Sequence, residues 1–166
     1  SCQELWRRLE ANGHIYLGSY AGWYAVRDEA FYAESELNDG PDGSKIAPSG
    51  AQAEWVEEPS YFFRLSAWQD RLIAYYEANP DCILPETRRN EVMSFVKGGL
   101  EDLSVSRTTF KWGVPVPGND AHIMYVWLDA LTNYITAVGY PETETGEYPR
   151  YWPADLHMVG KDILRF

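Results

Sequence analysis

The stretch His122-Ile-Met-Tyr-Val-Trp-Leu-Asp-Ala-Leu-Thr-Asn-Tyr134 decides the expected fold. Its apolar run from Ile123 to Val126 predicts a strand that is buried on both faces of a parallel sheet. Asp129 follows this run and is expected to cap the helix from Ala130 to Val138, because its carboxylate can accept the first amide protons. Strand, turn and helix would then meet at the carboxyl end of a central strand, where open α/β sheets bind ligands.

Two aromatic residues in this stretch leave its role open. Trp127 and Tyr134 are seven positions apart, about two helical turns, so both rings can face the same crevice above the sheet. One interpretation is a ligand pocket with aromatic walls. The alternative is core packing, because apolar stripes at helical spacing usually face a core.

This stretch and five further motifs are similar, in type and order, to bacterial methionyl-tRNA synthetases. The segment Tyr125 to Ala130 resembles that family's Tyr-Val-Trp-(Phe/Leu)-Asp-Ala. The further motifs are Arg88-Arg-Asn-Glu-Val92, Asp102-Leu-Ser-Val-Ser-Arg107, Trp112-Gly-Val-Pro-Val-Pro117, Trp152-Pro153 and His157-Met-Val-Gly-Lys-Asp-Ile163. Each motif is weak alone, but the family's order is kept over nearly the whole chain, which makes the combined signal specific.

The resemblance implies an α/β fold, namely an incomplete class I synthetase catalytic core of Rossmann type interrupted by a small α+β connective insertion. The implied parts are the end of the first catalytic half (1–13), the insertion (14–102) and the truncated second half (103–166). Periodicity predicts helices at 3–12, 66–78 (capped by Ser66) and 89–96, short strands within 15–36, and strands at 103–106 and 155–159. Because the chain opens on a helix without a starting methionine, we expect an internal piece of a longer protein.

The resemblance also implies a site. Class I synthetases join an amino-acid carboxylate to the α-phosphate of ATP, which requires positioning and charge stabilisation and no protein nucleophile. The implied roles are the methionine pocket for Trp127, Ala130, Tyr134 and Ile163, the reacting carboxylate for Arg107, and ATP for Gly160, Lys161 and Asp162. Leu131 stands where some relatives carry proline. Arg107 could instead be a surface arginine at a strand end, and Lys161 a solvated charge.

Two signatures of the resembled family, His-Ile-Gly-His and Lys-Met-Ser-Lys-Ser, do not occur in the sequence, nor does the pocket histidine that would follow Phe166. The isolated chain is therefore expected to be inactive. The implied partners of the full-length parent are methionine, ATP with Mg and tRNA(Met), and those of the chain are the missing segments of the same protein. His14, His122 and His157 show no nucleophilic arrangement with a serine or cysteine and are expected to be structural or exposed.

Zinc is not expected. Many relatives in the resembled family carry a cysteine knuckle in the insertion, in some at the place of Trp23-Tyr-Ala-Val-Arg-Asp28. Alanine cannot bind zinc, and Asp28 lacks the companions for a four-ligand site.

Composition narrows the functions and compartments that are compatible with this sequence. A net charge of −11 argues against nucleic-acid binding over most of the surface, so any tRNA contact is expected to be local. Cys2 and Cys82 form neither a disulfide framework nor a metal cluster, which favours a reducing cytosol. The sequence contains no signal peptide and no long apolar span, so no membrane partner is expected. Two alternatives stay open: a synthetase for leucine, isoleucine, valine or cysteine, although the first three should carry larger insertions, or a stand-alone binding module of this fold.

Overall fold

The computed structural model describes residues 1–28, 30–109, 111–161 and 163–164. The chain forms two compact units, one of Ser1–Tyr16 with Tyr61–Phe166 and the other of Leu17–Ser60. The limits expected for the connective insertion, 14 and 102, stay a prediction.

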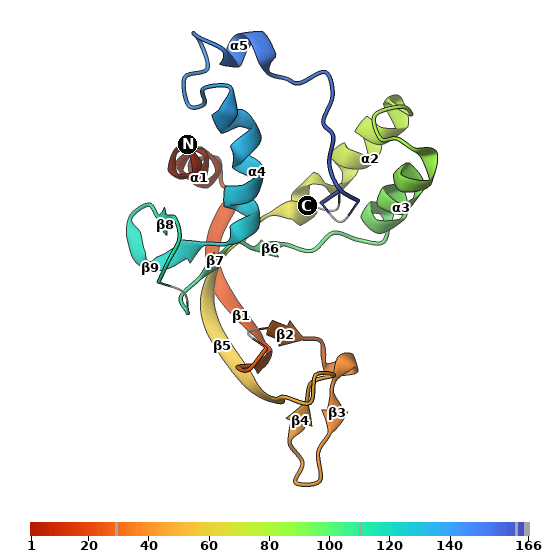
Figure 1. The fold of residues 1–166 in the computed structure, drawn as a ribbon, viewed down its shortest axis with the longest axis vertical. Helices are drawn as coiled ribbons and strands as arrows, with labels where there is room; N and C mark the ends of the chain where they lie inside the picture. The colour runs from red at the N-terminus through yellow and green to blue at the C-terminus, as the bar shows by residue number, and fades with distance from the viewer. Residues whose placement is uncertain (29, 110, 162, 165–166) are drawn as a thin grey trace. The chain divides into compact units, whose positions relative to one another are not determined.

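The elements of the chain can be followed by their labels in Figure 1. The helical elements are α1 (Cys2–Ala11), η1 (Glu34–Glu36), η2 (Leu65–Trp68), α2 (Gln69–Ala78), α3 (Glu86–Lys97), α4 (Val126–Ala137) and α5 (Tyr148–Tyr151). The strands are β1 (Ile15–Ala25), β2 (Ala30–Tyr32), β3 (Asn38–Asp39), β4 (Lys45–Ile46), β5 (Gln52–Phe63), β6 (Leu103–Ser104), β7 (Ser106–Arg107), β8 (Pro115–Val116) and β9 (Asn119–Met124). Within the described part of the chain, no helix has the length and apolar character needed to cross a bilayer. The helices expected from periodicity near 3–12, 66–78 and 89–96 are confirmed.

The strand predicted at Ile123 to Val126 belongs to a small antiparallel sheet, so the expected parallel pairing is wrong. The order is β7-β9-β8, with Arg107 opposite Ile123 and Pro115 opposite the same residue from the other side. Parallel neighbours need a crossover of a dozen or more residues. The connections from β7 to β8 and from β8 to β9 are shorter than that, so the chain can only turn back on itself.

The start of α4 also differs from the prediction. Tyr125 occupies the cap position, and Asp129 lies inside the first turn instead of capping the helix. The helix begins early because the strand ends at Met124, while the Tyr125 N–H still donates to the Val105 carbonyl at 2.8 Å. The Asp129 carboxylate accepts a hydrogen bond from the Cys2 thiol at 3.1 Å. Its charge still favours the helix, because the first turn carries the positive end of the helix dipole.

The strand expected at 155–159 is not present in the structure. This stretch has no regular hydrogen-bonding pattern and its side chains are exposed. A strand needs a neighbour to pair its N–H and C=O groups, and no described strand pairs with this one.

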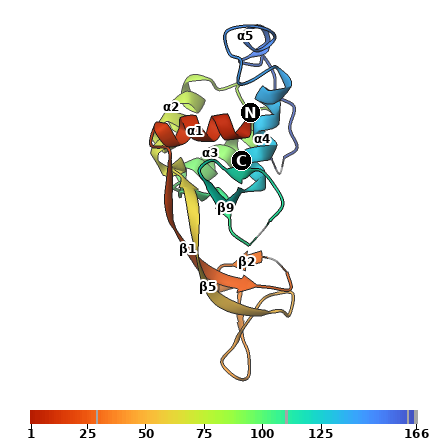
Figure 2. The same cartoon turned by 90° about the vertical axis from the view of Figure 1, so that its left-hand side faces the viewer.

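The core of the first unit lies where α1 meets the β7-β9-β8 sheet. Trp6 is completely buried and contacts the edge of the Tyr61 ring, with centroids 5.2 Å apart. Ile15, Val105 and Met124 complete the centre of this cluster with Val116. Figure 2 shows α1 and α4 close together beside this sheet. A second cluster, formed by Val92, Val96 and Leu100, joins α3 to α2.

Gly113 permits the close approach of the β7–β8 connection to β9. Its φ is +140°, and an added Cβ would lie 2.5 Å from the Ile123 Cγ2. We expect Gly113→Ala to lower the free energy of unfolding by about 2–4 kcal/mol, because a clash adds to the backbone strain. Gly118→Ala, in the turn between β8 and β9, is the matched control, since its φ is +78° but no atom lies within 4 Å of an added Cβ. Equal losses in urea unfolding would contradict this account.

Asp102 joins the start of β1 to η2. Its carboxylate accepts hydrogen bonds from the Tyr16 hydroxyl (2.8 Å) and from the Ser66 hydroxyl (2.5 Å) and N–H (3.2 Å). Ser66 thus binds Asp102 and does not cap a helix as expected, since the cap of η2 is Arg64 and that of α2 is Trp68. Partial burial raises the pKa of Asp102, but the hydrogen bonds from Ser66 and Tyr16 outweigh it and hold the pKa below its usual value.

The stabilising effect of Asp102 should depend on pH. Because its pKa is lower in the folded state, its contribution is fully present above the unfolded pKa, about 3.9, and is lost as the pH falls through the folded value. We expect Asp102→Asn to destabilise the protein at pH 7 and the difference from wild type to shrink below about pH 4. Urea unfolding across this pH range measures it, with the exposed Asp81→Asn as control. A difference that is independent of pH would contradict the assignment.

Candidate functional site

Helix α4 has two faces with different surroundings. Asp129, Thr132 and Thr136 lie on the side toward α1, where the Cys2–Asp129 hydrogen bond forms and Thr132 is buried. Trp127 and Tyr134 lie on the opposite side of α4, about half a helical turn from these three residues. The predicted pocket residues Trp127, Ala130 and Tyr134, together with Leu131, share this second face, and all are half-buried. The structure therefore brings the three α4 members of the predicted pocket to one side of one helix.

Arg107 is held at the start of this helix. Its Nη1 donates to the Ser104 hydroxyl at 2.6 Å and to the Ser106 carbonyl at 2.7 Å. Its guanidinium carbon lies 4.2 Å from the centroid of the Tyr125 ring, which is a cation–π contact. Tyr125 caps α4, two positions before Trp127. A fixed cation thus lies beside the positive end of a helix, and this combination favours an anionic group.

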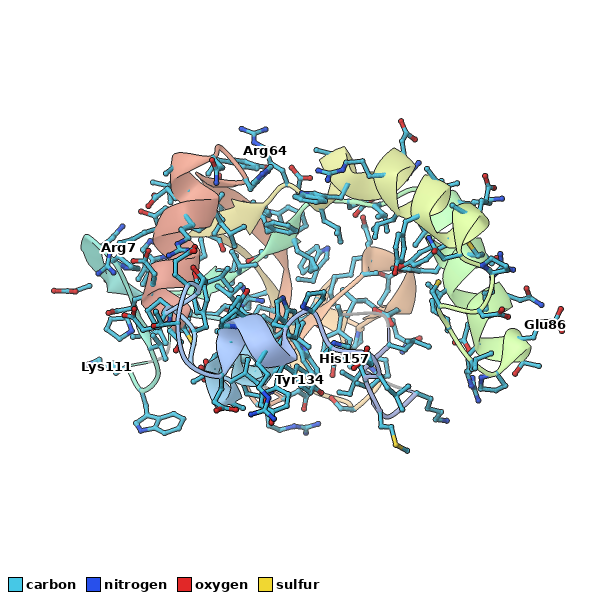
Figure 3. All side chains as sticks on the ribbon, turned by 90° about the horizontal axis from the view of Figure 1, so that it is seen from above. Arg7, Arg64, Glu86, Lys111, Tyr134 and His157 are labelled. Carbon is cyan, nitrogen blue, oxygen red and sulfur yellow. The ribbon has the colours of Figure 1, made fainter. Side chains whose placement is uncertain are left out.

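Aromatic rings surround the far end of the pocket face. The rings of Tyr134 and His157 meet edge to face at 5.4 Å, and His157 meets Trp152 in the same way at 5.5 Å. Figure 3 labels Tyr134 and His157, which lie next to each other. Neither His157 nor Tyr125 was predicted as part of the site. Tyr125 precedes Trp127 closely enough to be suspected, but the sequence gives no signal that His157 reaches Tyr134.

The residues expected to face ATP lie in the C-terminal segment. Gly160 and Lys161 are exposed, Ile163 is half-buried, and Asp162 lies outside the described residues. The Ile163 N–H donates to the Gly160 carbonyl at 3.0 Å, which closes a turn. Lys161 borders a cavity of about 730 Å³ between the α2–α3 region and residues 154–159. The structure thus brings Gly160 and Ile163 together in this segment.

His122 and Ser106 form a buried pair that the sequence analysis missed. The Ser106 Oγ and the His122 Nδ1 are 3.0 Å apart, and the two residues are 0% and 3% exposed. His122 was expected to be structural or exposed, and its hydrogen bond to Ser106 was not predicted. The pair cannot serve as a nucleophile for a substrate, because burial excludes one from the hydroxyl.

Alanine packing occupies the place where some relatives of the resembled family carry a zinc knuckle. Ala25 is completely buried and packs with Ala47, Ala51 and Ala53. The Asp28 carboxylate accepts hydrogen bonds from the side chains of Ser49 and Tyr32. The side chains here do not fit a zinc site, and among the described residues no group of three or more His, Cys, Asp or Glu side chains could hold a metal ion.

Metal analysis of the purified, tag-free protein tests this point. We expect zinc well below one equivalent, because the described residues offer no four-ligand set. Stoichiometric zinc in the unaltered protein would contradict the assignment.

Comparison with known proteins defines the class. The sequence model described as tRNA synthetases class I (M) matches residues 1–166, so the fold is that of a class I aminoacyl-tRNA synthetase. The methionine–tRNA ligase of Mesorhizobium japonicum is 64% identical over 166 residues, which are 100% of this chain and 32% of the relative. That of Rickettsia conorii is 66% identical over 161 residues, 97% of this chain and 31% of the relative.

A solved structure agrees. Mycobacterium tuberculosis methionyl-tRNA synthetase bound by methionyl-adenylate superposes with a TM-score of 0.83 at 60% identity, covering 99% of this chain and 32% of that one. The chain belongs to the methionyl-tRNA synthetase family. It spans about a third of the length of the curated relatives that it matches.

Proposed function

We propose that the full-length protein containing this chain is a methionine–tRNA ligase, which forms methionyl-adenylate from methionine and ATP and transfers methionine to tRNA(Met). The observation that carries this proposal is the 60% identity over 99% of the chain to an enzyme solved with methionyl-adenylate. The matching relatives are methionine–tRNA ligases, which disfavours both a leucine, isoleucine, valine or cysteine synthetase and a non-catalytic module.

In this proposal the half-buried face of α4 forms the methionine pocket. Trp127, Ala130 and Tyr134 face the side chain, and Ile163 closes the pocket from the C-terminal segment. A thioether gains from contact with aromatic edges, which this face offers. The small Ala130 leaves room between the two rings, which lie at spacing i and i+7 on one side of α4.

Arg107 then faces the methionine carboxylate. That carboxylate must approach the α-phosphate of ATP, and two anions repel each other unless a fixed cation lies beside them. The Ser104, Ser106 and Tyr125 contacts fix the guanidinium before substrate arrives, so no reorganisation is needed at the moment of attack. One oxygen of the carboxylate forms the new bond to the α-phosphorus. The bond between the α-phosphorus and the oxygen that bridges it to the β-phosphorus breaks, which releases pyrophosphate.

Gly160, Lys161 and Asp162 are proposed to approach ATP, and Mg²⁺ enters with the ATP phosphates as part of the substrate. The insertion is proposed to span 14–102. The free thiols of Cys2 and Cys82 support a reducing compartment such as the cytosol.

Amino-acid-dependent ATP–pyrophosphate exchange tests the proposal on the full-length protein. Methionine should support exchange, whereas leucine, isoleucine, valine and cysteine should not. Preferential exchange with one of the other four amino acids would overturn the assignment to methionine, and no exchange with any amino acid would overturn the activity itself.

A further inference from the structure

Neighbouring residues of β7 point to opposite sides, as in any strand. Ser106 faces inward and is completely buried, while the guanidinium of Arg107 lies over the Tyr125 ring on the other side. The two residues therefore connect the interior of the sheet with the proposed carboxylate site. Any group that fixes Ser106 also fixes the backbone from which Arg107 extends.

Two elements hold the Ser106 side chain. The Tyr61 N–H, near the end of β5, donates to the Ser106 Oγ at 2.9 Å, and His122 of β9 lies 3.0 Å away through its Nδ1. The Tyr61 ring meets the His122 ring edge to face at 5.0 Å, and the Asn119 amide donates to the Tyr61 hydroxyl at 3.2 Å. A buried polar network that is fully bonded makes its members rigid.

This network reaches Arg107 through the Ser106 carbonyl. The Ser106 C=O accepts from the Arg107 Nη1 at 2.7 Å, so the residue that His122 holds is the residue that holds the guanidinium. The second acceptor of the same nitrogen is Ser104, two residues earlier along the chain. A movement of the Ser106 backbone would shift the arginine directly, and sub-ångström placement matters where a charge must face a reacting group.

We propose that His122, through its hydrogen bond to Ser106, is a positioning residue for Arg107 and thereby for the carboxylate of the amino acid substrate. The inference rests on the proposed function and adds a residue to it. His122 touches no reacting atom, because it is 3% exposed and lies on the inner side of the sheet. Its effect must therefore appear only on ligands that Arg107 contacts.

The test compares two ligands that differ at the carboxylate. The dissociation constants of L-methionine and of L-methioninol, in which a neutral CH₂OH replaces the carboxylate, are measured by calorimetry on the full-length protein. His122→Leu removes the hydrogen bond to Ser106. We expect methionine binding to weaken about tenfold, the scale of one lost buried hydrogen bond, and methioninol binding to change less than about twofold.

Three further variants separate positioning from general damage. His122→Asn keeps a polar atom close to the Nδ1 position and should restore methionine binding to within about threefold of wild type. Ser106→Ala removes the same bond with a smaller change of volume and replaces His122→Leu if that variant does not fold. Val96→Ala destabilises the cluster that Val96 forms with Val92 and Leu100, and it should leave the ratio of the two constants unchanged.

The decisive comparison uses Arg107→Gln. If His122 acts through Arg107, then His122→Leu should have no further effect on methionine binding in the Arg107→Gln background. Equal weakening of both ligands, an undiminished effect in that background, or no effect at all would overturn the proposal. If the wild-type protein binds neither ligand, the proposed function itself is wrong. If the wild type binds methionine but His122→Leu weakens methionine and methioninol binding equally, only the positioning role is wrong.

Discussion

Trp127→Ala should lower kcat/KM for methionine by about two to three decades in the full-length protein. The substitution removes a large ring from the half-buried face of α4. Truncation of a buried tryptophan lowers the free energy of unfolding by about 3–5 kcal/mol. We take the lower end as the scale of the binding free energy that a half-buried ring contributes to a ligand packed against it. The proposed contact between the ring and the methionine sulfur would be lost as well. Methionine-dependent ATP–pyrophosphate exchange measures the loss, and KM for ATP should stay nearly constant.

Trp112→Ala is the control for this variant. The Trp112 side chain is 92% exposed, so its removal deletes an equal volume without creating a cavity in a packed region. We expect wild-type exchange from it. Wild-type methionine kinetics in Trp127→Ala would show that the α4 face does not bind methionine and that its aromatic residues only pack.

Arg107→Gln should reduce kcat/KM for methionine by about a hundredfold to a thousandfold. Removal of one donor from a preorganised site typically costs this much, and the lost group also carries the charge that is proposed to lie between two anions. Arg107→Lys should be intermediate, since it keeps the charge but not the planar fork that binds Ser104 and Ser106. The rate of adenylate formation in a single turnover is measured for the wild type, Arg107→Gln and Arg107→Lys.

The unfolding free energy provides the control for Arg107→Gln. Arg107 is half-buried and contacts the Tyr125 ring, so some loss of stability is expected. A variant that is folded at the assay temperature and forms the adenylate at the wild-type rate would remove Arg107 from the site.

Local patterns predicted most of the helices and the grouping of Trp127 and Tyr134 on one side of α4. Trp6 and Leu9 mark α1 by their helical spacing, and both face the core. The same spacing places Trp127 and Tyr134 together on α4, because a helix is a local structure and its faces follow from residue order. The role of these residues came from the resemblance, since spacing alone favoured core packing.

Long-range arrangements could not be read from the sequence. Ile123 sits in an antiparallel sheet although its neighbourhood is apolar enough for a parallel one, since pairing depends on connection length as well as on hydrophobicity. Ser106 and His122 are 16 positions apart, and no periodicity links them. The C-terminal stretch 155–159 has the apolar character of a strand but finds no partner among the described residues, so composition alone does not make it one.

A chimeric enzyme tests whether these residues form a methionine site. These 166 residues would replace the corresponding segment of Mycobacterium tuberculosis methionyl-tRNA synthetase, to which they are 60% identical. Because the α4 face and Arg107 are proposed to bind methionine, the account predicts methionine-dependent ATP–pyrophosphate exchange by the chimera and its loss in the Trp127→Ala chimera. A folded chimera without methionine-dependent exchange, or one that is unaffected by Trp127→Ala, would contradict it.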